Sequence, residues 1–444
     1  MESRAAQSDL SQVADKLLVN VRNLQNAVTL ASEEELSAVL ARIKQILVKI
    51  AQWSSIDADF SISDSQSPVW IHSVAIEAIS GALEDADRVL QASSSSVEST
   101  PEHKAFVSTT YEATRPSLPV PDNSYNLFVS VLKEKPHGKF EWNPPSHQEV
   151  KPVAFLPSFD QLESFPHPYE LEIQALDCPA YIYEEVTVNP FVELDEHELI
   201  WVKTEQELRS LCKILDEQKD FAVDLEAHQE HSYQGFVCLM QISTRSQDFI
   251  VDPFCVWEYM HLLNSSFTNP NIIKVLHGAD WDINWLQRDF GIYVVNLLDT
   301  GLAAKLLKFQ SKGLKYLLQH FCKVETDKKY QLADWRLRPL TEDMIKYARM
   351  DTHYLLYVFD QLRNLISQQR LTSEWFQESN KLCLQRYEKT ILSTSQCYDL
   401  AARMSKAKLT PIQRQVFLCL YIWRDIVARS LDESASYEFR FFQF

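Results

Sequence analysis

Features typical of membrane, secreted and redox proteins are absent from this sequence of 444 residues. No stretch approaches the roughly 18 consecutive apolar residues that a transmembrane helix needs. The first residues, MESRAAQSDLSQVADKLL, contain no hydrophobic region of a signal peptide. None of the eight cysteines stands in a CxxC pair, so their spacing indicates neither zinc ligation nor a redox motif. We therefore expect a soluble intracellular protein with reduced thiols and no membrane partner.

Positive charge is also scarce, with 43 Lys and Arg against 61 Asp and Glu and a net charge of −18. This balance argues against a protein coated with basic nucleic-acid contacts, although a local basic groove remains compatible with it. The densest basic stretch comprises Lys305, Lys308, Lys312, Lys315, Lys323, Lys328, Lys329, Arg336 and Arg338. It is suited to tracking a nucleic-acid backbone, and an ordinary solvated helix face is the alternative.

Composition divides the chain into four regions. Residues 1–95 show apolar positions at helical spacing and predict a helical domain. Residues 96–195 contain 13 of the 18 prolines with interleaved aromatics, which favours a Pro-rich linker and an arm lying on a folded surface. In residues 196–370, successive strands are followed by strands alternating with helices, which predicts a mixed α/β sheet. Residues 371–444 return to a helical pattern, with a helix opening at Pro411.

The sheet region can be divided into individual elements. Hydrophobic patterns predict strands over 199–202, 221–227, 235–244, 248–252, 271–278 and 293–300, and helices over 204–215, 257–263 and 279–291. Thr204 and Glu207 form the sequence signature of a capping box at the start of the first helix.

Four acidic residues fall in contexts that bring them toward one edge of this sheet. Asp224 and Glu226 lie two residues apart on a strand and therefore project from the same face. Asp282 lies early in a helix that follows a strand, and Asp351 shares one side of a periodic helix with Tyr347, four residues before it. Each signal alone has an ordinary structural explanation: a solvated strand face or salt bridge, a helix-dipole contact, or an incidental helical pair.

Together these residues indicate a specific chemistry. Hard oxygen ligands of this kind suit Mg²⁺ or Mn²⁺. Two such ions roughly 3.5–4 Å apart support in-line phosphoryl displacement. A tyrosine hydroxyl beside the attacking water can orient it or help to remove its proton.

The surrounding motifs resemble a known family. VDLEAH, VLHGADWDINWLQRDFG and YARMDTHYLL resemble the three exonuclease motifs of the DEDD superfamily, in its tyrosine-bearing subgroup. Three further segments narrow the resemblance to the RNase D-like branch: SYQGFVCLMQIST, YVVNLLDT and KKYQLADWRLRPL. Within that branch, the chain resembles the exosome component 10 family of exosome-associated 3′→5′ exoribonucleases. The resemblance implies an RNase H-like mixed-sheet exonuclease domain, flanked by an N-terminal helical domain and a C-terminal helical region. It also implies hydrolysis that releases nucleoside 5′-monophosphates in nuclear RNA processing and decay.

The resemblance also assigns roles to residues by their positions in the motifs. Two divalent ions, Mg²⁺ or Mn²⁺, would be held by Asp224, Glu226, Asp282 and Asp351, and Tyr347 would position the attacking water. In GADWD the motif residue aligns with Asp282, which makes Asp280 a neighbour; the reverse assignment is the alternative.

Three further residues are candidates for RNA contacts. Lys329 occupies the position of a phosphate-proximal lysine in the family motif. His228 follows the acidic pair and is close to the predicted site. Trp281 precedes Asp282; burial against the core is the role we favour for it, with base stacking as the alternative.

The flanking regions carry a weaker resemblance. Residues 1–95 resemble a helical domain that binds a small helical nuclear cofactor protein, residues 166–176 resemble an arm that wraps the catalytic domain, and residues 405–429 resemble the first part of an HRDC domain. We therefore expect 371–444 to be a partial HRDC region of a C-terminally truncated chain.

The resemblance further implies partners and a location. These are single-stranded RNA 3′ ends, the nuclear exosome core, and a nuclear, nucleolus-enriched localisation. A DNA 3′→5′ exonuclease of the same superfamily and a non-catalytic exosome adaptor remain the alternatives, because the metal motifs do not distinguish RNA from DNA.

Overall fold

The computed structural model describes residues 118–119, 121–142, 166–326 and 328–392, with isolated residues between 421 and 434. The chain divides into two units, one formed by residues 112–391 and the other by residues 1–111 with 392–444. The helical domain expected over 1–95 and the helix expected from Pro411, with most of the partial HRDC region, lie outside the described residues. The predicted sheet region lies entirely within the unit of residues 112–391, which we call the central unit.

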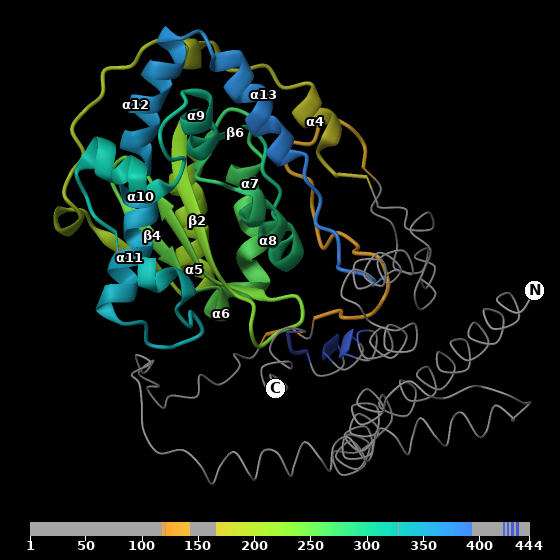
Figure 1. Cartoon of the computed structure of the whole chain (residues 1–444). Coiled ribbons are helices and arrows are strands. Elements are labelled where there is room, and N and C mark those ends of the chain that lie inside the picture. Colours follow the sequence, from red (N-terminus) through yellow and green to blue (C-terminus); the bar gives the residue numbers. More distant parts are fainter. Residues whose placement is uncertain are drawn as a thin grey trace, which may run out of the picture. The chain divides into compact units, whose positions relative to one another are not determined.

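A six-stranded mixed sheet forms the centre of this unit (Figure 1). Its strands are β1 (Leu199–Val202), β2 (Asp220–His228), β3 (Phe236–Ser243), β4 (Asp248–Val251), β5 (Ile273–Leu276) and β6 (Leu297–Asp299), in the order β1-β4-β3-β2-β5-β6. Strand β3 runs antiparallel to β2 and β4, and the other pairings are parallel. This confirms the expected mixed α/β sheet, with the longest strand, β2, in an interior position.

Helices cover both faces of the sheet. The principal ones are α5 (Glu205–Asp216), α8 (Asp280–Phe290), α9 (Thr300–Leu306), α11 (Glu342–His353), α12 (Leu355–Gln368) and α13 (Thr372–Cys383). Shorter elements are α4 (Glu170–Gln174), α6 (Pro253–Val256), α7 (Asn264–Phe267), α10 (Leu314–Leu317), η2 (Ala180–Tyr183), η3 (Leu194–Glu196), η4 (Trp257–Leu263), η5 (Leu318–Cys322) and η6 (Lys328–Leu332). Among the described helices, none combines the length and apolar character that spanning a bilayer requires.

Alternation along β2 separates two hydrophobic cores. Phe221, Val223 and Leu225 face one core, together with buried residues of α5, α7 and α8. Ala222 faces the opposite core, which is covered by α9, α11 and α12. Because side chains alternate along a strand, Asp224 and Glu226 share the face of Ala222. The two acids therefore point toward the layer that contains α11.

Local signals determine the ends of several helices. The Thr204 hydroxyl accepts from the Glu207 amide, and the Glu207 carboxylate accepts from the Thr204 amide, so the predicted capping box is present. Helix α8 ends at Gly291, whose φ of 62° is left-handed, a conformation that favours glycine. The segment expected as a helix over 257–263 is the 3₁₀ helix η4, between the short helices α6 and α7.

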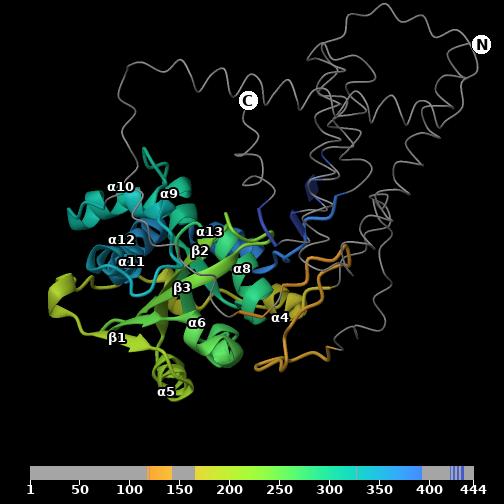
Figure 2. The ribbon, with the colours of Figure 1, turned by 90° about the horizontal axis from the view of Figure 1, so that it is seen from below.

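The described parts of the Pro-rich region lie along the surface of the central unit (Figures 1 and 2). Tyr293 donates to the Ser130 hydroxyl at 2.7 Å, and Thr268 donates to the carbonyl of Pro136 at 3.1 Å. On α12, the amide of Asn364 both donates to and accepts from the backbone of Val186. Long-range contacts of this kind are what an arm lying on a folded surface requires, while residues 143–165 are outside the described part.

Candidate active site

Three carboxylates from two elements meet at the face of the sheet covered by α11. Ligand oxygens of Asp224 and Glu226 on β2 and of Asp351 on α11 lie within 4.8 Å of one another. The strand supplies two of them because residues two apart share a face. The helix supplies the third because α11 packs directly on β2 and β3. The structure thus brings together residues that are 125 positions apart in the chain from Glu226 to Asp351.

Asp282 adds a fourth carboxylate from the first turn of α8. It is buried, and its charge interacts unfavourably with that of Asp224. Asp280, one of the two candidates in GADWD, is instead exposed and accepts a hydrogen bond from Gln385 at 3.2 Å. The geometry therefore assigns Asp282, and not Asp280, to the carboxylate centre, by which we mean Asp224, Glu226, Asp282 and Asp351.

The carboxylate centre is electrostatically unsatisfied by the protein itself. Burial raises the pKa of Asp224 to about 7. Burial, followed by repulsion from the neighbouring carboxylates, raises the pKa values of Glu226, Asp282 and Asp351 well above their usual range. Within the described part of the chain, no Lys, Arg or His forms an ion pair with any of the four. Buried charges of one sign require a counter-charge, and four hard oxygen donors suit divalent cations.

Tyr347 lies one turn before Asp351 on α11, and the Asp351 carboxylate contributes to the shift of its pKa. Its ring lies 5.7 Å from that of Tyr330 and 6.1 Å from that of Trp335, measured between centroids. Burial and the nearby carboxylates raise the pKa of Tyr347, because a phenolate there would face the charges of Asp351, Glu226 and Asp224. The hydroxyl therefore stays protonated at neutral pH and is held at the edge of the carboxylate centre.

Asp299 is a neighbouring acid that the sequence reasoning did not single out. It caps α9 by accepting from the Leu302 amide at 2.8 Å, and its other oxygen accepts from the Ala279 amide at 2.9 Å. It thereby fixes the turn from which α8 and Asp282 begin, and its charge helps to raise the pKa of Asp282. The capping role could have been predicted, because the aspartate in YVVNLLDT stands between a strand and a helix. The hydrogen bond to Ala279 could not, because it joins residues 20 positions apart.

The three candidate RNA contacts have different environments. His228 is buried, its Nε2 accepts from the His231 amide at 2.9 Å, and burial lowers its pKa to about 4. Lys329 is exposed on η6, with its ammonium 4.7 Å from the centre of the Tyr330 ring. Trp281 is 66% exposed.

The expected packing role of Trp281 is therefore wrong. The residue lies one position before Asp282 on α8, and consecutive helical side chains point about 100° apart, so burying Asp282 turns Trp281 outward. Its ring stacks on that of Trp285, with 6.3 Å between centroids.

The basic stretch is divided between internal and exposed charges. The Arg338 guanidinium binds Asp252 and the carbonyl of Cys238, and Arg336 pairs with Asp334 at 2.7 Å. Exposed lysines of the stretch are Lys305, Lys308, Lys312, Lys315, Lys323 and Lys329. These lysines are therefore exposed at the surface, whereas the two arginines form ion pairs within the protein.

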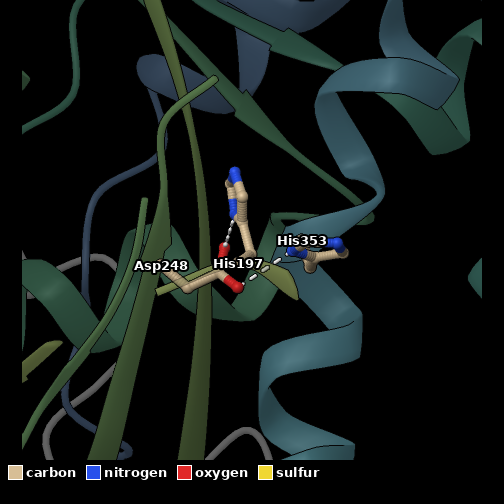
Figure 3. A group of neighbouring side chains, drawn as sticks. All are labelled: His197, Asp248 and His353. Carbon is tan, nitrogen blue, oxygen red and sulfur yellow. Dashed lines mark hydrogen bonds and ion pairs between the residues drawn. The ribbon is translucent and has the colours of Figure 1, made fainter. Parts of the chain in front are cut away.

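A second polar cluster lies at helix α11 and contains His197, Asp248 and His353 (Figure 3). Arg349, also on α11, joins it through an ion pair with Asp248. We call it the Asp248 cluster. Asp248 accepts from Arg349 and from His353 Nδ1, each at 2.9 Å, and from Ser243 at 2.7 Å. His353 Nε2 donates to the carbonyl of Val192 at 2.8 Å. Both ring nitrogens of His353 therefore face oxygen acceptors.

These partners decide the charge state of Asp248. Burial by itself would raise the pKa of Asp248, but the hydrogen bonds and charges of His353, Ser243 and Arg349 outweigh it and lower that pKa to about 2. Two histidines and one aspartate thus lie within reach of one another as possible metal ligands, yet Arg349 already pairs with the carboxylate. The cluster fastens α11 to β4 and was not anticipated from the sequence.

Comparisons with known proteins agree with this architecture. Residues 199–367 match a family model described as 3′-5′ exonuclease. The exosome complex exonuclease RRP6 of Saccharomyces cerevisiae is 41% identical over 332 residues, which cover 71% of this chain and 44% of that protein. Exosome complex component 10 of Homo sapiens is 42% identical over 281 residues, covering 62% of this chain and 32% of that protein. The chain thus spans less than half the length of these curated relatives.

A solved structure extends the likeness to the fold. The crystal structure of the catalytic core of RRP6 from Trypanosoma brucei superposes with a TM-score of 0.59 at 44% sequence identity, covering 62% of this chain and 76% of that chain. Residues 199–367, which match the exonuclease family model, include the elements β2, α8 and α11 that carry the carboxylate centre. The chain therefore belongs to the family of RRP6 and exosome component 10, whose members carry a 3′-5′ exonuclease domain.

Proposed function

We propose that this protein is a metal-dependent, hydrolytic 3′→5′ exoribonuclease that releases nucleoside 5′-monophosphates. The observation that carries the proposal is the convergence of Asp224, Glu226 and Asp351, whose ligand oxygens lie within 4.8 Å of one another inside a 3′-5′ exonuclease domain. Buried Asp282 adjoins them. Carboxylates that burial and mutual repulsion hold at raised pKa values are ready to exchange protons for cations.

The four carboxylates are the residues that would hold two divalent ions, Mg²⁺ or Mn²⁺. Such ions, when bound, supply an activated water and stabilise the leaving oxygen of a phosphodiester. Asp224 and Glu226 offer their oxygens from a rigid interior strand, and Asp282 and Asp351 offer theirs from helices packed against it. Asp299, at the end of β6, fixes the position of the first turn of α8 by accepting a hydrogen bond from the Ala279 amide.

Tyr347 would orient the attacking water. Its ring packs beside those of Tyr330 and Trp335, which limits the positions of the hydroxyl next to Asp351. Since its pKa is raised, the tyrosine acts through a hydrogen bond of its neutral hydroxyl and not as a phenolate base.

The RNA strand would approach over the exposed residues beside the carboxylate centre. Trp281 presents an aromatic face of the kind on which bases stack, and Lys329 offers a cation for a phosphate. His228 stays a prediction, because its buried ring faces the β2–β3 connection.

The family membership supports a wider setting. The relatives are named as exosome components, and we extend this to the chain: its partners would be RNA 3′ ends and the nuclear exosome core, in the nucleus with nucleolar enrichment. Binding of a small helical nuclear cofactor protein by residues 1–95, a wrapping arm within 96–195 and a partial HRDC region over 371–444 are proposals that rest on sequence resemblance.

A digestion experiment tests the proposed activity. Single-stranded RNA labelled at its 3′ end should yield a labelled mononucleotide at once, and the same RNA labelled at its 5′ end should yield a ladder of shortening products. EDTA should stop both reactions, and Mg²⁺ or Mn²⁺ should restore them. A 5′-labelled mononucleotide appearing first, or full activity in EDTA, would exclude the proposal.

The same assay separates the alternatives. Equal or faster digestion of a DNA oligonucleotide of the same sequence would favour a DNA exonuclease. A folded protein that is inactive with both metals but still captures the exosome core would favour a non-catalytic adaptor.

A further inference from the structure

Gln241 is a buried polar residue in the interior strand β3. It is 1% exposed, and neither Nε2 nor Oε1 of its side chain has a hydrogen-bond partner. Buried polar groups are almost always hydrogen-bonded, because an unpaired group loses its hydration without compensation. An amide in this position therefore needs a partner beyond those its own neighbours supply.

Its place in the sheet identifies that partner. In the antiparallel β2–β3 ladder Gln241 stands directly opposite Asp224. Residues paired in this way project to the same face, with Cβ atoms about 4.5–5.5 Å apart. Ser243 is two residues further along β3 and therefore on the same face, and its hydroxyl oxygen lies 2.8 Å from that of Thr352 on α11. Gln241 thus lies beside Asp224, on the face of the sheet that α11 covers.

The other neighbours of Gln241 on this face leave it few polar options. Its partner on β4 is Ile250, and Leu239 lies two residues before it, both in a hydrophobic core with Ala348 of α11. Ser243 is committed to Asp248 and Thr352. An apolar side chain would fit such surroundings, so the amide is explained by Asp224.

We propose that Gln241 is a positioning residue for the carboxylate centre: its Nε2 donates to the Asp224 carboxylate when divalent ions are bound, and its Oε1 accepts from water held by those ions. A neutral amide is suited to this task because it orients a carboxylate without neutralising it. A lysine or arginine in the same place would compete with the metal for Asp224. The inference rests on the proposed function only in requiring that the centre binds divalent ions.

The test replaces Gln241 by methionine, which keeps the length of the side chain and removes both polar atoms. Mn²⁺ affinity is measured on the full chain without RNA, by calorimetry and by electron paramagnetic resonance, and the melting temperature is measured in EDTA. We expect Mn²⁺ affinity to fall about 10–100-fold, as for other groups that orient metal ligands. The melting temperature in EDTA should not fall, since the lost atoms have no hydrogen bonds to lose.

Gln287 provides a matched control. It is equally buried, but its amide donates to the carbonyl of Gln385 at 2.8 Å and accepts from the Tyr387 amide at 2.9 Å. Gln287→Met should therefore lower the melting temperature in EDTA and leave Mn²⁺ affinity within about twofold. The two variants have opposite signatures although the substitution is the same.

Each outcome decides the matter. Unchanged Mn²⁺ affinity in Gln241→Met would overturn the inference, and so would a variant that no longer folds in EDTA, because the amide would then contribute to the metal-free structure. Absence of Mn²⁺ binding by the wild-type protein would instead contradict the metal centre of the proposed function. The wild-type titration thus distinguishes failure of the function from failure of this inference.

Discussion

The carboxylate centre and the Asp248 cluster lie on the same face of one sheet and both involve helix α11, yet their electrostatics are opposite. In the carboxylate centre, burial and mutual repulsion raise the pKa values. In the Asp248 cluster, Arg349 and His353 lower the pKa of Asp248 to about 2 in spite of burial. Burial alone would raise the carboxyl pKa values in both clusters. The opposite shift of Asp248 is therefore due to the hydrogen-bonding and charged side chains around it. One cluster is complete within the protein, and the other requires ions from solution.

Helix α11 connects the two clusters. Tyr347 and Asp351, four residues apart, serve the carboxylate centre, while Arg349 and His353, also four residues apart, serve Asp248. The Asp248 cluster therefore fixes the helix from which Asp351 projects. We infer that the Asp248 cluster, whose charge is neutralised within the protein, stabilises the position of α11. This allows the mutually repelling acids of the carboxylate centre to stay together.

The same Asp→Asn change should act in opposite directions in the two clusters. Asp282→Asn should reduce RNA hydrolysis by roughly 10³-fold or more, because a ligand charge worth several kcal/mol to the transition state is lost. It should also raise the melting temperature in EDTA, since one of four repelling carboxylates is gone. Rates from single-turnover digestion and a thermal melt measure both effects.

Asp280→Asn is the matched control for that change, because Asp280 is exposed on the same helix. It should keep nearly wild-type hydrolysis. If Asp282→Asn digested RNA at the wild-type rate, the assignment of Asp282 as a ligand would be wrong.

Asp248→Asn should destabilise the protein by about 3–5 kcal/mol, because it leaves the largely buried Arg349 guanidinium without its anion. Urea unfolding of the protein in EDTA gives the change in the free energy of unfolding. Mn²⁺ affinity at a temperature where the variant is folded should change far less than stability does. A stability equal to that of the wild type would mean that the Asp248 cluster does not fasten α11.

Tyr347→Phe tests whether the tyrosine acts on chemistry or on binding. The rate of the hydrolytic step should fall about 10²-fold, since the water loses an orienting hydroxyl, while the Kd for RNA measured in Ca²⁺ should stay within about twofold. Ring packing against Tyr330 and Trp335 is kept by phenylalanine, so the melting temperature should be nearly unchanged. Comparable losses in rate and RNA affinity would argue against water positioning.

The pH dependence of stability should reveal both clusters at once. A carboxyl whose pKa is higher in the folded state binds more protons when folded, so stability falls as pH rises between the unfolded and folded pKa values. For Asp224 these values are 3.8 and about 7, so the melting temperature in EDTA should decline over that window. Saturating Mn²⁺ should suppress the decline.

Asp248 should show the opposite dependence. Its folded pKa of about 2 lies below its ordinary value of 3.8, so its contribution to stability is complete above about pH 4 and is lost as pH falls toward 2. Asp248→Asn should remove the acid-side loss alone, and Asp224→Asn should weaken the decline between pH 4 and 7 alone. Identical profiles for the two variants would contradict the comparison between the clusters.

Much of the architecture was predictable because it depends on local patterns. The capping box at Thr204 and Glu207 and the alternation of β2 each rest on a few consecutive residues. The helix predicted over 257–263 is a 3₁₀ helix, because turn type depends on hydrogen bonds that a hydrophobic period does not specify. Trp281 was misjudged because its hydrophobic character favoured burial, whereas its neighbour Asp282 decided which side of α8 faces inward.

By itself, the sequence determined that the acids lie on a strand and two helices, since that depends on local structure alone, and from their motifs it predicted a nuclease-type centre with Asp280 as the alternative to Asp282. Only the tertiary structure decided which polar groups support that centre. Asp248 meets Arg349 across 101 positions, Asp299 reaches back 20 positions to Ala279, and Gln241 faces Asp224 through strand register. Such pairs form when packing excludes water and each buried polar group must find a partner, and no local pattern records that choice.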